Sequence, residues 1–210
     1  MKKAVIFDLD GTLWDSAQGV ADSWNIVLER RDLPQRMDAE LIHAYMGKTM
    51  VEISDKLFPE LEQSVRLDLL EELCGVEVEY LRHHTAARLF DGLEETAALL
   101  KKDYSLYIVS NCQEGYIPTF LLPFHMDRWF EDYEEWGRTG LSKGENIRLV
   151  MERNGVDRAV YVGDTDGDER AARDAGVPFI HAAYGFGTAL APDAVIHSLS
   201  ELPDAVRKFM

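Results

Sequence analysis

The fold of this chain is decided close to its start, by the stretch Ala4-Val5-Ile6-Phe7-Asp8-Leu9-Asp10-Gly11-Thr12. Its first four residues form a short, uninterrupted apolar run, which is typical of a strand buried on both faces. Asp8 and Asp10 follow, and burying two carboxylates is costly unless a cation or hydrogen-bond donors pair with them. Gly11 then lets backbone N–H groups approach an oxyanion. The alternative is an ordinary turn at the end of a strand, with aspartate as the turn former.

Four further apolar runs predict strands of the same kind, at residues 104–109, 159–162, 178–182 and 194–196. Helical patterns lie between or beside them, at residues 93–102, 113–122, 144–154 and 168–175. This alternation predicts an α/β fold, a Rossmann-like parallel sheet with helices on both faces. In such sheets ligands bind beyond the carboxyl ends of the strands.

The segment 16–88 follows a different pattern, with apolar residues at helical spacing after Ala17 and again between Val65 and Tyr80. We therefore predict a Rossmann-like catalytic core made of residues 1–15 and 89–210, with residues 16–88 inserted as a small α-helical cap domain. Trp14 and Trp24 are expected to pack between the core and the cap.

Composition limits the possible partners of the chain. Its 210 residues include 22 basic and 38 acidic side chains, a formal net charge of −16. This charge repels phosphate polymers, so neither nucleic acid nor an anionic membrane is an expected partner. Asp8 also interrupts the first apolar run far too early for a secretory signal peptide. We expect a soluble cytoplasmic protein, and the sequence makes no prediction of its oligomeric state.

A second acidic cluster, Gly163-Asp164-Thr165-Asp166-Gly167-Asp168, follows the predicted strand 159–162. Carboxyl ends of parallel strands meet at one edge of a sheet, so this cluster should approach Asp8 and Asp10. Oxygen ligands without His or Cys favour Mg²⁺ over zinc. The alternative is a solvated acidic turn that caps the following helix.

Two weaker signals concern phosphate. Ser110 and Asn111 follow the strand 104–109 and can donate hydrogen bonds to a phosphoryl oxygen, although a helix cap would also explain them. Lys143 opens a predicted helix, where a positive charge is unfavourable against the helix dipole unless an anion binds there. An ordinary surface lysine is the alternative.

Taken in chain order, these residues resemble the four motifs of the haloacid dehalogenase superfamily: Asp8-Leu9-Asp10-Gly11-Thr12, Ser110-Asn111, Lys143, and Gly163-Asp164 with Asp168. Over its whole length the chain is similar to the phosphoglycolate phosphatase and β-phosphoglucomutase-like branch, in which a helical cap follows the first motif. The resemblance implies a Mg²⁺-dependent phosphatase that hydrolyses a small phosphorylated metabolite, with phosphoglycolate as the branch's default substrate, through an aspartyl-phosphate intermediate.

The resemblance also implies residue roles. Asp8 would be the nucleophile and Asp10 the general acid/base. Mg²⁺ would bind the Asp8 carboxylate, the Asp10 backbone carbonyl and the Asp164 carboxylate, with Asp168 supporting the metal. The implied phosphate-binding residues are Ser110 and Lys143, assisted by Asn111 and the amides of Gly11 and Thr12. In the cap, Lys48 could contact a second anionic group of the substrate, or it could be an exposed lysine.

Two other functions remain open at this point. A sugar-phosphate mutase of the same superfamily shares the whole core and differs mainly in its cap. A regulatory protein of another class would bind Mg²⁺ and carry a phosphate on Asp8 without useful turnover. A dehalogenase is disfavoured, because it needs no metal and does not require Asp10.

Overall fold

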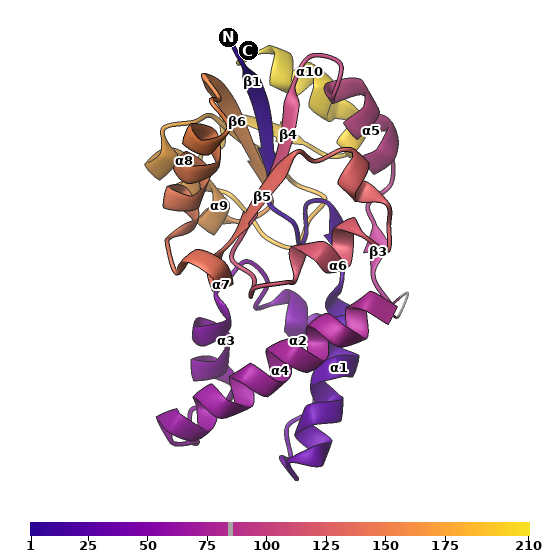
Figure 1. Ribbon diagram of the computed structural model, residues 1–210, viewed down its shortest axis with the longest axis vertical. Coiled ribbons are helices and arrows are strands. Elements are labelled where there is room, and N and C mark those ends of the chain that lie inside the picture. The colour runs from indigo at the N-terminus through magenta and orange to yellow at the C-terminus, as the bar shows by residue number, and fades with distance from the viewer. Residues whose placement is uncertain (84–85) are drawn as a thin grey trace.

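The computed structural model describes residues 1–83 and 86–210. Residues 84–85, which fall within the predicted cap, lie outside this description. The chain forms a sheet flanked by helices at one end and a group of helices at the other (Figure 1). The main sheet has six parallel strands in the order β5-β4-β1-β6-β7-β8. Their bounds are β1 Lys3–Phe7, β4 Ser105–Ser110, β5 Asp132–Glu135, β6 Arg158–Gly163, β7 Phe179–Ala182 and β8 Ala194–Ile196.

Alternate residues of the first strand enter two different hydrophobic cores, as the period of a strand requires. Val5 and Phe7 belong to one core, and Ala4 and Ile6 belong to the other. Helices therefore cover both faces, and the predicted α/β fold is confirmed. The helices and short 3-10 turns of this part are α5 Leu93–Leu100, α6 Ile117–Leu121, η1 Met126–Arg128, α7 Trp136–Thr139, α8 Lys143–Arg153, α9 Asp166–Ala175, η2 Leu199–Glu201 and α10 Leu202–Arg207.

The five predicted strands are present, whereas the predicted helix 113–122 is shorter, since α6 begins only at Ile117. Gly115 has a φ of +86°, a left-handed conformation that interrupts a right-handed helix. The segment before α6 therefore turns, and it carries Gln113 and Tyr116 into the contacts described below.

Strand β5 is not predicted, because its sequence Asp-Tyr-Glu-Glu contains no apolar run. It lies at the edge of the sheet with two buried glutamates. Glu134 pairs with Arg138 at 2.7 Å and with Arg153 at 2.8 Å. Glu135 accepts a hydrogen bond from the Gly115 N–H at 2.7 Å. Paired charges of this kind let a polar sequence occupy an edge strand.

The inserted segment is helical, as predicted, and lies at the end of the molecule away from the chain termini (Figure 1). Its longest helix, α4, runs unbroken through Gly75, although glycine costs about 1 kcal/mol in a helix interior. Leu69, Leu73 and Leu81 are buried and offset that cost through packing. The helices of this segment are α1 Ala17–Arg30, α2 Ala39–His43, α3 Met50–Leu57 and α4 Gln63–His83.

A small antiparallel pair joins the two ends of the insertion, since β2 (Trp14–Asp15) pairs with β3 (Arg88–Leu89). The pair lies where the sequence predicts that the chain leaves and re-enters the core. The exact domain boundaries, 15/16 and 88/89, stay a prediction. Among the described residues, no helix has both the length and the apolar character that crossing a membrane demands.

Candidate active site

Three buried carboxylates meet at the carboxyl end of the central strands. Asp8 directly follows β1, Asp164 directly follows β6, and Asp168 lies in the first turn of α9. Each offers one oxygen, and these oxygens lie within 4.8 Å of one another. None of the three residues is more than 1% exposed. Asp166 does not join them, because it is exposed and pairs with Arg170 at 2.5 Å.

Lys143 supplies a buried positive charge beside this cluster. Its Nζ lies 3.0 Å from Asp8 Oδ1 and 2.7 Å from Asp168 Oδ1. Burial alone would lower the pKa of Lys143, but the neighbouring Asp168 and Asp8 carboxylates raise it above its ordinary value. At 6% exposure, this residue is not an ordinary surface lysine. The first turn of α8 therefore holds a permanent cation at the sheet edge.

Asp168 organises this surrounding structure. Its Oδ1 accepts the hydrogen bond from Lys143, and its Oδ2 accepts from the backbone N–H of Thr165 at 3.0 Å and from the Thr165 hydroxyl at 2.7 Å. The Thr165 hydroxyl in turn accepts from the Asp168 N–H, which completes a capping box at the start of α9. Asp168 thus fixes both Lys143 and the loop that carries Asp164. Its support of a metal ion stays a prediction.

The donors of the protein leave this negative charge incompletely satisfied. Asp8 Oδ1 is contacted by the Lys143 ammonium. Asp8 Oδ2 and Asp164 Oδ1 are buried and, among the described residues, accept no hydrogen bond. Asp164 Oδ2, in contrast, accepts from the backbone N–H groups of Phe186 at 2.8 Å and Gly187 at 3.2 Å. Burial raises the pKa of Asp8 and of Asp164, and the charge of Asp168 raises both further.

A hard divalent cation fits this arrangement. Three buried carboxylates face one lysine, and two of them direct uncommitted oxygens at a common space. Oxygen-only ligand sets of this kind suit Mg²⁺ or Ca²⁺ better than a transition metal. The orphaned oxygens identify Asp8 and Asp164 as the residues best placed to hold such an ion.

The turn after β1 brings the backbone close to this cluster. Gly11 has a φ of +77°, and a Cβ at this position would collide with the Asp164 carboxylate. Its N–H donates to the Trp14 carbonyl at 3.0 Å, and the Thr12 N–H donates to the Leu9 carbonyl at 3.2 Å. These two amides are thus engaged within the turn in this conformation, and their predicted contact with phosphate stays untested. The turn requires glycine because only glycine permits both this φ and this close approach.

Asp10 lies in a different environment from Asp8. Its Oδ1 accepts hydrogen bonds from Trp14 Nε1 at 2.9 Å, Ser16 Oγ at 2.8 Å and Tyr116 OH at 2.9 Å. The Ser16 and Tyr116 hydroxyls also lie 2.7 Å apart. Burial raises the pKa of Asp10, and the three hydrogen bonds oppose that increase. Trp14 is fully buried, and its indole N–H orients this carboxylate. Its packing between core and cap stays a prediction.

The contacts of Ser16 and Tyr116 with Asp10 are not predicted from the sequence. Tyr116 lies 106 residues from Asp10, in a segment predicted to be plain helix, so no local pattern connects the two. Ser16 is the residue before α1, a position that usually signals a helix cap. In the structure its side chain caps nothing and instead donates to Asp10.

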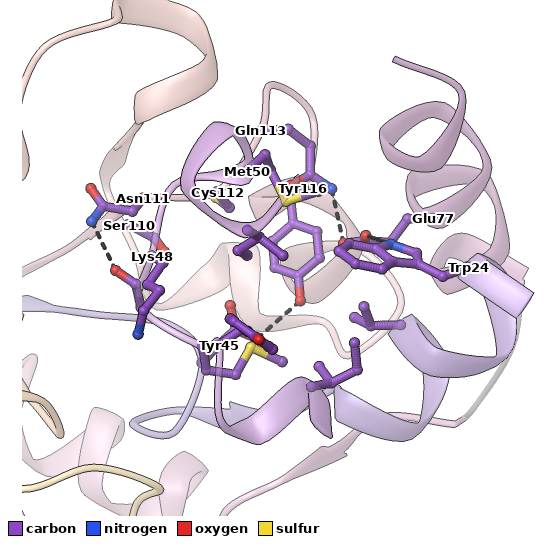
Figure 2. Close-up of a pocket in the computed structure, with 16 residues that line it drawn as sticks. Trp24, Tyr45, Lys48, Met50, Glu77, Ser110, Asn111, Cys112, Gln113 and Tyr116 are labelled. Atoms are coloured by element: carbon purple, nitrogen blue, oxygen red, sulfur yellow. Dashed lines mark hydrogen bonds between the residues drawn. The ribbon is translucent and has the colours of Figure 1, made fainter. Parts of the chain in front are cut away.

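The remaining predicted residues lie where core and insertion meet (Figure 2). Ser110 ends β4, is 5% exposed and lines a cavity there. Asn111 also lines it, and its side-chain amide donates to the Gly47 carbonyl of the insertion at 2.9 Å. Lys48 lines this cavity and a larger open cleft that contains Lys143. The structure therefore places Ser110, Asn111 and Lys48 beside one space, with Asp10 on its wall.

The fold and the site together define a Rossmann-like α/β protein with a helical insertion and a buried acidic cluster at the carboxyl edge of its sheet. Residues 5–182 match the family model described as haloacid dehalogenase-like hydrolase, and the chain belongs to this family. The resemblance predicted from the motifs is thereby confirmed.

Relatives and solved structures agree with this assignment. A phosphoglycolate phosphatase from Xanthomonas campestris is 31% identical over 193 residues, which cover 88% of this chain and 84% of the relative. A phosphoglycolate phosphatase from Photorhabdus laumondii is 29% identical over an alignment of 222 positions, which covers 95% of this chain and 90% of the relative. The structure of a haloacid dehalogenase-like hydrolase from Bacteroides fragilis superimposes with a TM-score of 0.83 at 26% identity, and the match covers 96% of this chain and all of that one.

We expect Mg²⁺ to stabilise the metal-free protein. A ligand at about 100 times its Kd adds about 2.7 kcal/mol, and each kcal/mol raises Tm by roughly 2–4 °C in a chain of about this size. Thermal unfolding at neutral pH should therefore show an increase of about 5–10 °C. Asp164→Asn should raise the Tm of the metal-free protein, because it removes a buried charge, and should abolish the response to Mg²⁺.

Asp166→Asn is the matched control, since Asp166 lies in the same loop but outside the cluster. It should respond to Mg²⁺ as the wild type does. An unchanged Tm of the wild type, or an equal shift in Asp164→Asn, would contradict the proposed ligands.

Proposed function

We propose that this chain is a Mg²⁺-dependent phosphoric monoester hydrolase that forms a phosphate ester on Asp8. The supporting observation is the buried Asp8 carboxylate in a chain of the haloacid dehalogenase-like hydrolase family: its Oδ1 pairs with the buried Lys143, and its Oδ2 is uncommitted. The relatives named phosphoglycolate phosphatases favour a small phosphorylated metabolite as substrate and make phosphoglycolate the reference ester.

Binding of the phosphoryl group would use the charges at the sheet edge. Lys143 would exchange part of its contact with Asp8 for a phosphoryl oxygen, while Asp168 keeps its ammonium in place. Ser110, at the adjacent strand end, would donate a further hydrogen bond. Mg²⁺, held by the carboxylates of Asp8 and Asp164 and the carbonyl of Asp10, would supply positive charge to the phosphoryl oxygens.

Asp8 would attack phosphorus in line with the ester oxygen. A bond forms between a carboxylate oxygen of Asp8 and phosphorus, and the bond from phosphorus to the ester oxygen breaks. Asp10 gives its proton to the departing alkoxide. It then takes a proton from the water that attacks the phosphorylated Asp8, which releases phosphate and restores both carboxyl groups.

The surroundings of Asp10 suit this task. Three donors occupy Oδ1, so the transferable proton would reside on Oδ2. Burial raises the pKa of this carboxyl group, which favours the protonated form that a general acid requires. Asp8 has no comparable set of donors: Lys143 contacts its Oδ1, and its Oδ2 is free for phosphorus.

Asp8→Asn should reduce Mg²⁺-dependent phosphate release from p-nitrophenyl phosphate and phosphoglycolate to the level of the buffer. The amide is a poor nucleophile, but it has nearly the same size, so circular dichroism should show a folded protein. Asp166→Asn again serves as the control and should retain activity. Turnover by Asp8→Asn at the wild-type rate would exclude Asp8 as the nucleophile.

Tyr116→Phe should impair the hydrolysis of esters with poor leaving groups. It removes one donor that orients Asp10, so we expect kcat/KM for an alkyl phosphate to fall by roughly tenfold, part of the about 10²–10⁴-fold that a general acid supplies. The value for p-nitrophenyl phosphate should change far less, because p-nitrophenolate leaves without protonation. The ratio kcat/KM isolates phosphorylation of the enzyme from the later hydrolysis.

Tyr104→Phe, at the opposite end of β4, is the control for loss of a tyrosine hydroxyl. It should leave kcat/KM unchanged for the alkyl phosphate and for p-nitrophenyl phosphate. If Tyr116→Phe lowered kcat/KM for both esters by the same factor, Tyr116 would have only a structural role.

A further inference from the structure

One buried acid takes no part in the mechanism above. Glu77 lies on α4, in the insertion, is 2% exposed and lines the same cavity as Asp10 and Ser110. Its Oε1 accepts a hydrogen bond from Gln113 Nε2 at 2.9 Å, and its Oε2 accepts one from Trp24 Nε1. Figure 2 shows Glu77 and Trp24 on one side of the cavity, with Ser110 and Asn111 on the other.

Glu77 lacks a positive partner. Within residues 1–83 and 86–210, no lysine, arginine or histidine forms an ion pair with it. Each carboxylate oxygen can accept two hydrogen bonds, so one acceptor position on each remains available. Burial raises the pKa of Glu77 to about 7, which reflects the cost of an unpaired charge in this place. A ligand that brings a positive charge would remove that cost.

The remaining walls of the cavity are largely apolar. The cavity volume open to the centre of a water-sized group is about 50 Å³. Its apolar lining comes mainly from the insertion, and the residues are Val20, Trp24, Ile42, Met46, Met50 and Ile53. The rings of Trp24, Tyr45 and Tyr116 also line it, and aromatic faces attract cations. Such walls suit a short hydrocarbon chain and offer few hydrogen bonds to a polyol.

Lys48 does not neutralise this chamber. Hydrogen bonds from Thr49 lower the pKa of Glu52 and one from Arg170 lowers that of Asp166, and the positive charge of Lys48 contributes to both. Both of these acidic residues line the larger open cleft and not the chamber of Glu77. Lys48 lines both spaces, but within residues 1–83 and 86–210 it forms no ion pair with Asp10 or Glu77, the two acidic groups of the chamber.

We infer that the leaving group carries a protonated amine on a short apolar chain, so that the substrates are phosphate monoesters of amino alcohols and Glu77 is the residue that selects them. The inference rests on the proposed phosphatase function. With phosphorus at Asp8 and the ester oxygen at Asp10, the leaving group extends into this chamber, where Glu77 accepts hydrogen bonds from the ammonium. A carboxylate in the same position would meet two acidic groups in a site of low polarity.

The wild-type protein provides the first test. kcat/KM with Mg²⁺ is measured for three series of phosphate esters with two to four carbons: ω-aminoalkyl, unsubstituted alkyl and ω-carboxyalkyl, the last including phosphoglycolate. We expect the aminoalkyl esters to exceed alkyl esters of equal length by at least tenfold, and the carboxyalkyl esters to be the poorest. A preference for alkyl or carboxyalkyl esters would overturn this inference and leave the phosphatase function intact. Failure to hydrolyse any ester, p-nitrophenyl phosphate included, would overturn both.

Glu77→Gln provides the second test, because it removes the charge and keeps the size. We expect the ratio of aminoalkyl to alkyl kcat/KM to fall at least tenfold, whereas Glu79→Gln, an exposed change on the same helix, should keep the wild-type ratio. An unchanged ratio in Glu77→Gln would mean that Glu77 only joins α4 to Gln113. If Glu77→Gln fails to fold, the comparison of the three ester series with the wild-type protein still tests the inference.

Discussion

The constraint on which the rest of this structure depends is the burial of three carboxylates against one ammonium group. Asp8, Asp164 and Asp168 converge where parallel strands end, and Lys143 is the one cation that forms ion pairs within this cluster among the described residues. An arrangement of this kind is unfavourable by itself, since the desolvation of charges exceeds what one ion pair returns. The surrounding backbone is therefore specialised to hold it. Gly163, for instance, is required because a Cβ there would overlap the Asp168 carboxylate. A site that concentrates negative charge in this way favours the binding of cations. The bound cations in turn allow an anion to bind.

The two acidic residues of the first motif show how one short segment can supply two different chemistries. Asp8 faces the sheet edge, where its neighbours are charged groups and its Oδ2 remains uncommitted. Asp10, two residues later, faces the junction with the insertion, where its neighbours are the neutral donors of Trp14, Ser16 and Tyr116. Because Ser16 is the last residue before α1, the orientation of Asp10 is tied to the first helix of the insertion. The position of the cap and the geometry of the acid are thus coupled through a single hydrogen bond.

Much of this arrangement could be predicted from the sequence, and the parts that could not share a physical reason. Buried parallel strands leave apolar runs, and their carboxyl ends must meet, so the approach of Asp164 to Asp8 follows from pattern and topology. Strand β5 leaves no such run, because Glu134 is neutralised by Arg138 and Arg153, and Glu135 accepts hydrogen bonds from the backbone N–H groups of Gly115 and Ile117. Tyr116 and Glu77 are likewise defined by contacts between remote segments. Their roles depend on the residues that the fold brings into contact with them, and the spacing of residues in the sequence does not indicate those contacts.

Because the core and the inserted helices contribute different parts of the site, similarity to relatives gives limited information about the substrate. The groups proposed for phosphoryl transfer lie on strand ends and adjacent turns, within a few contacts of Asp8, so changing any of them disturbs the others. The leaving-group chamber is built mainly from the insertion, where Glu77, Trp24 and their apolar neighbours contact the core chiefly through Gln113 and Tyr116. A residue in that position can change from acidic to basic or apolar without altering the sheet edge. Sequence identity near 30% therefore carries the reaction class from one member to another far better than it carries the leaving group. The charge of the chamber is the more direct guide to the substrate.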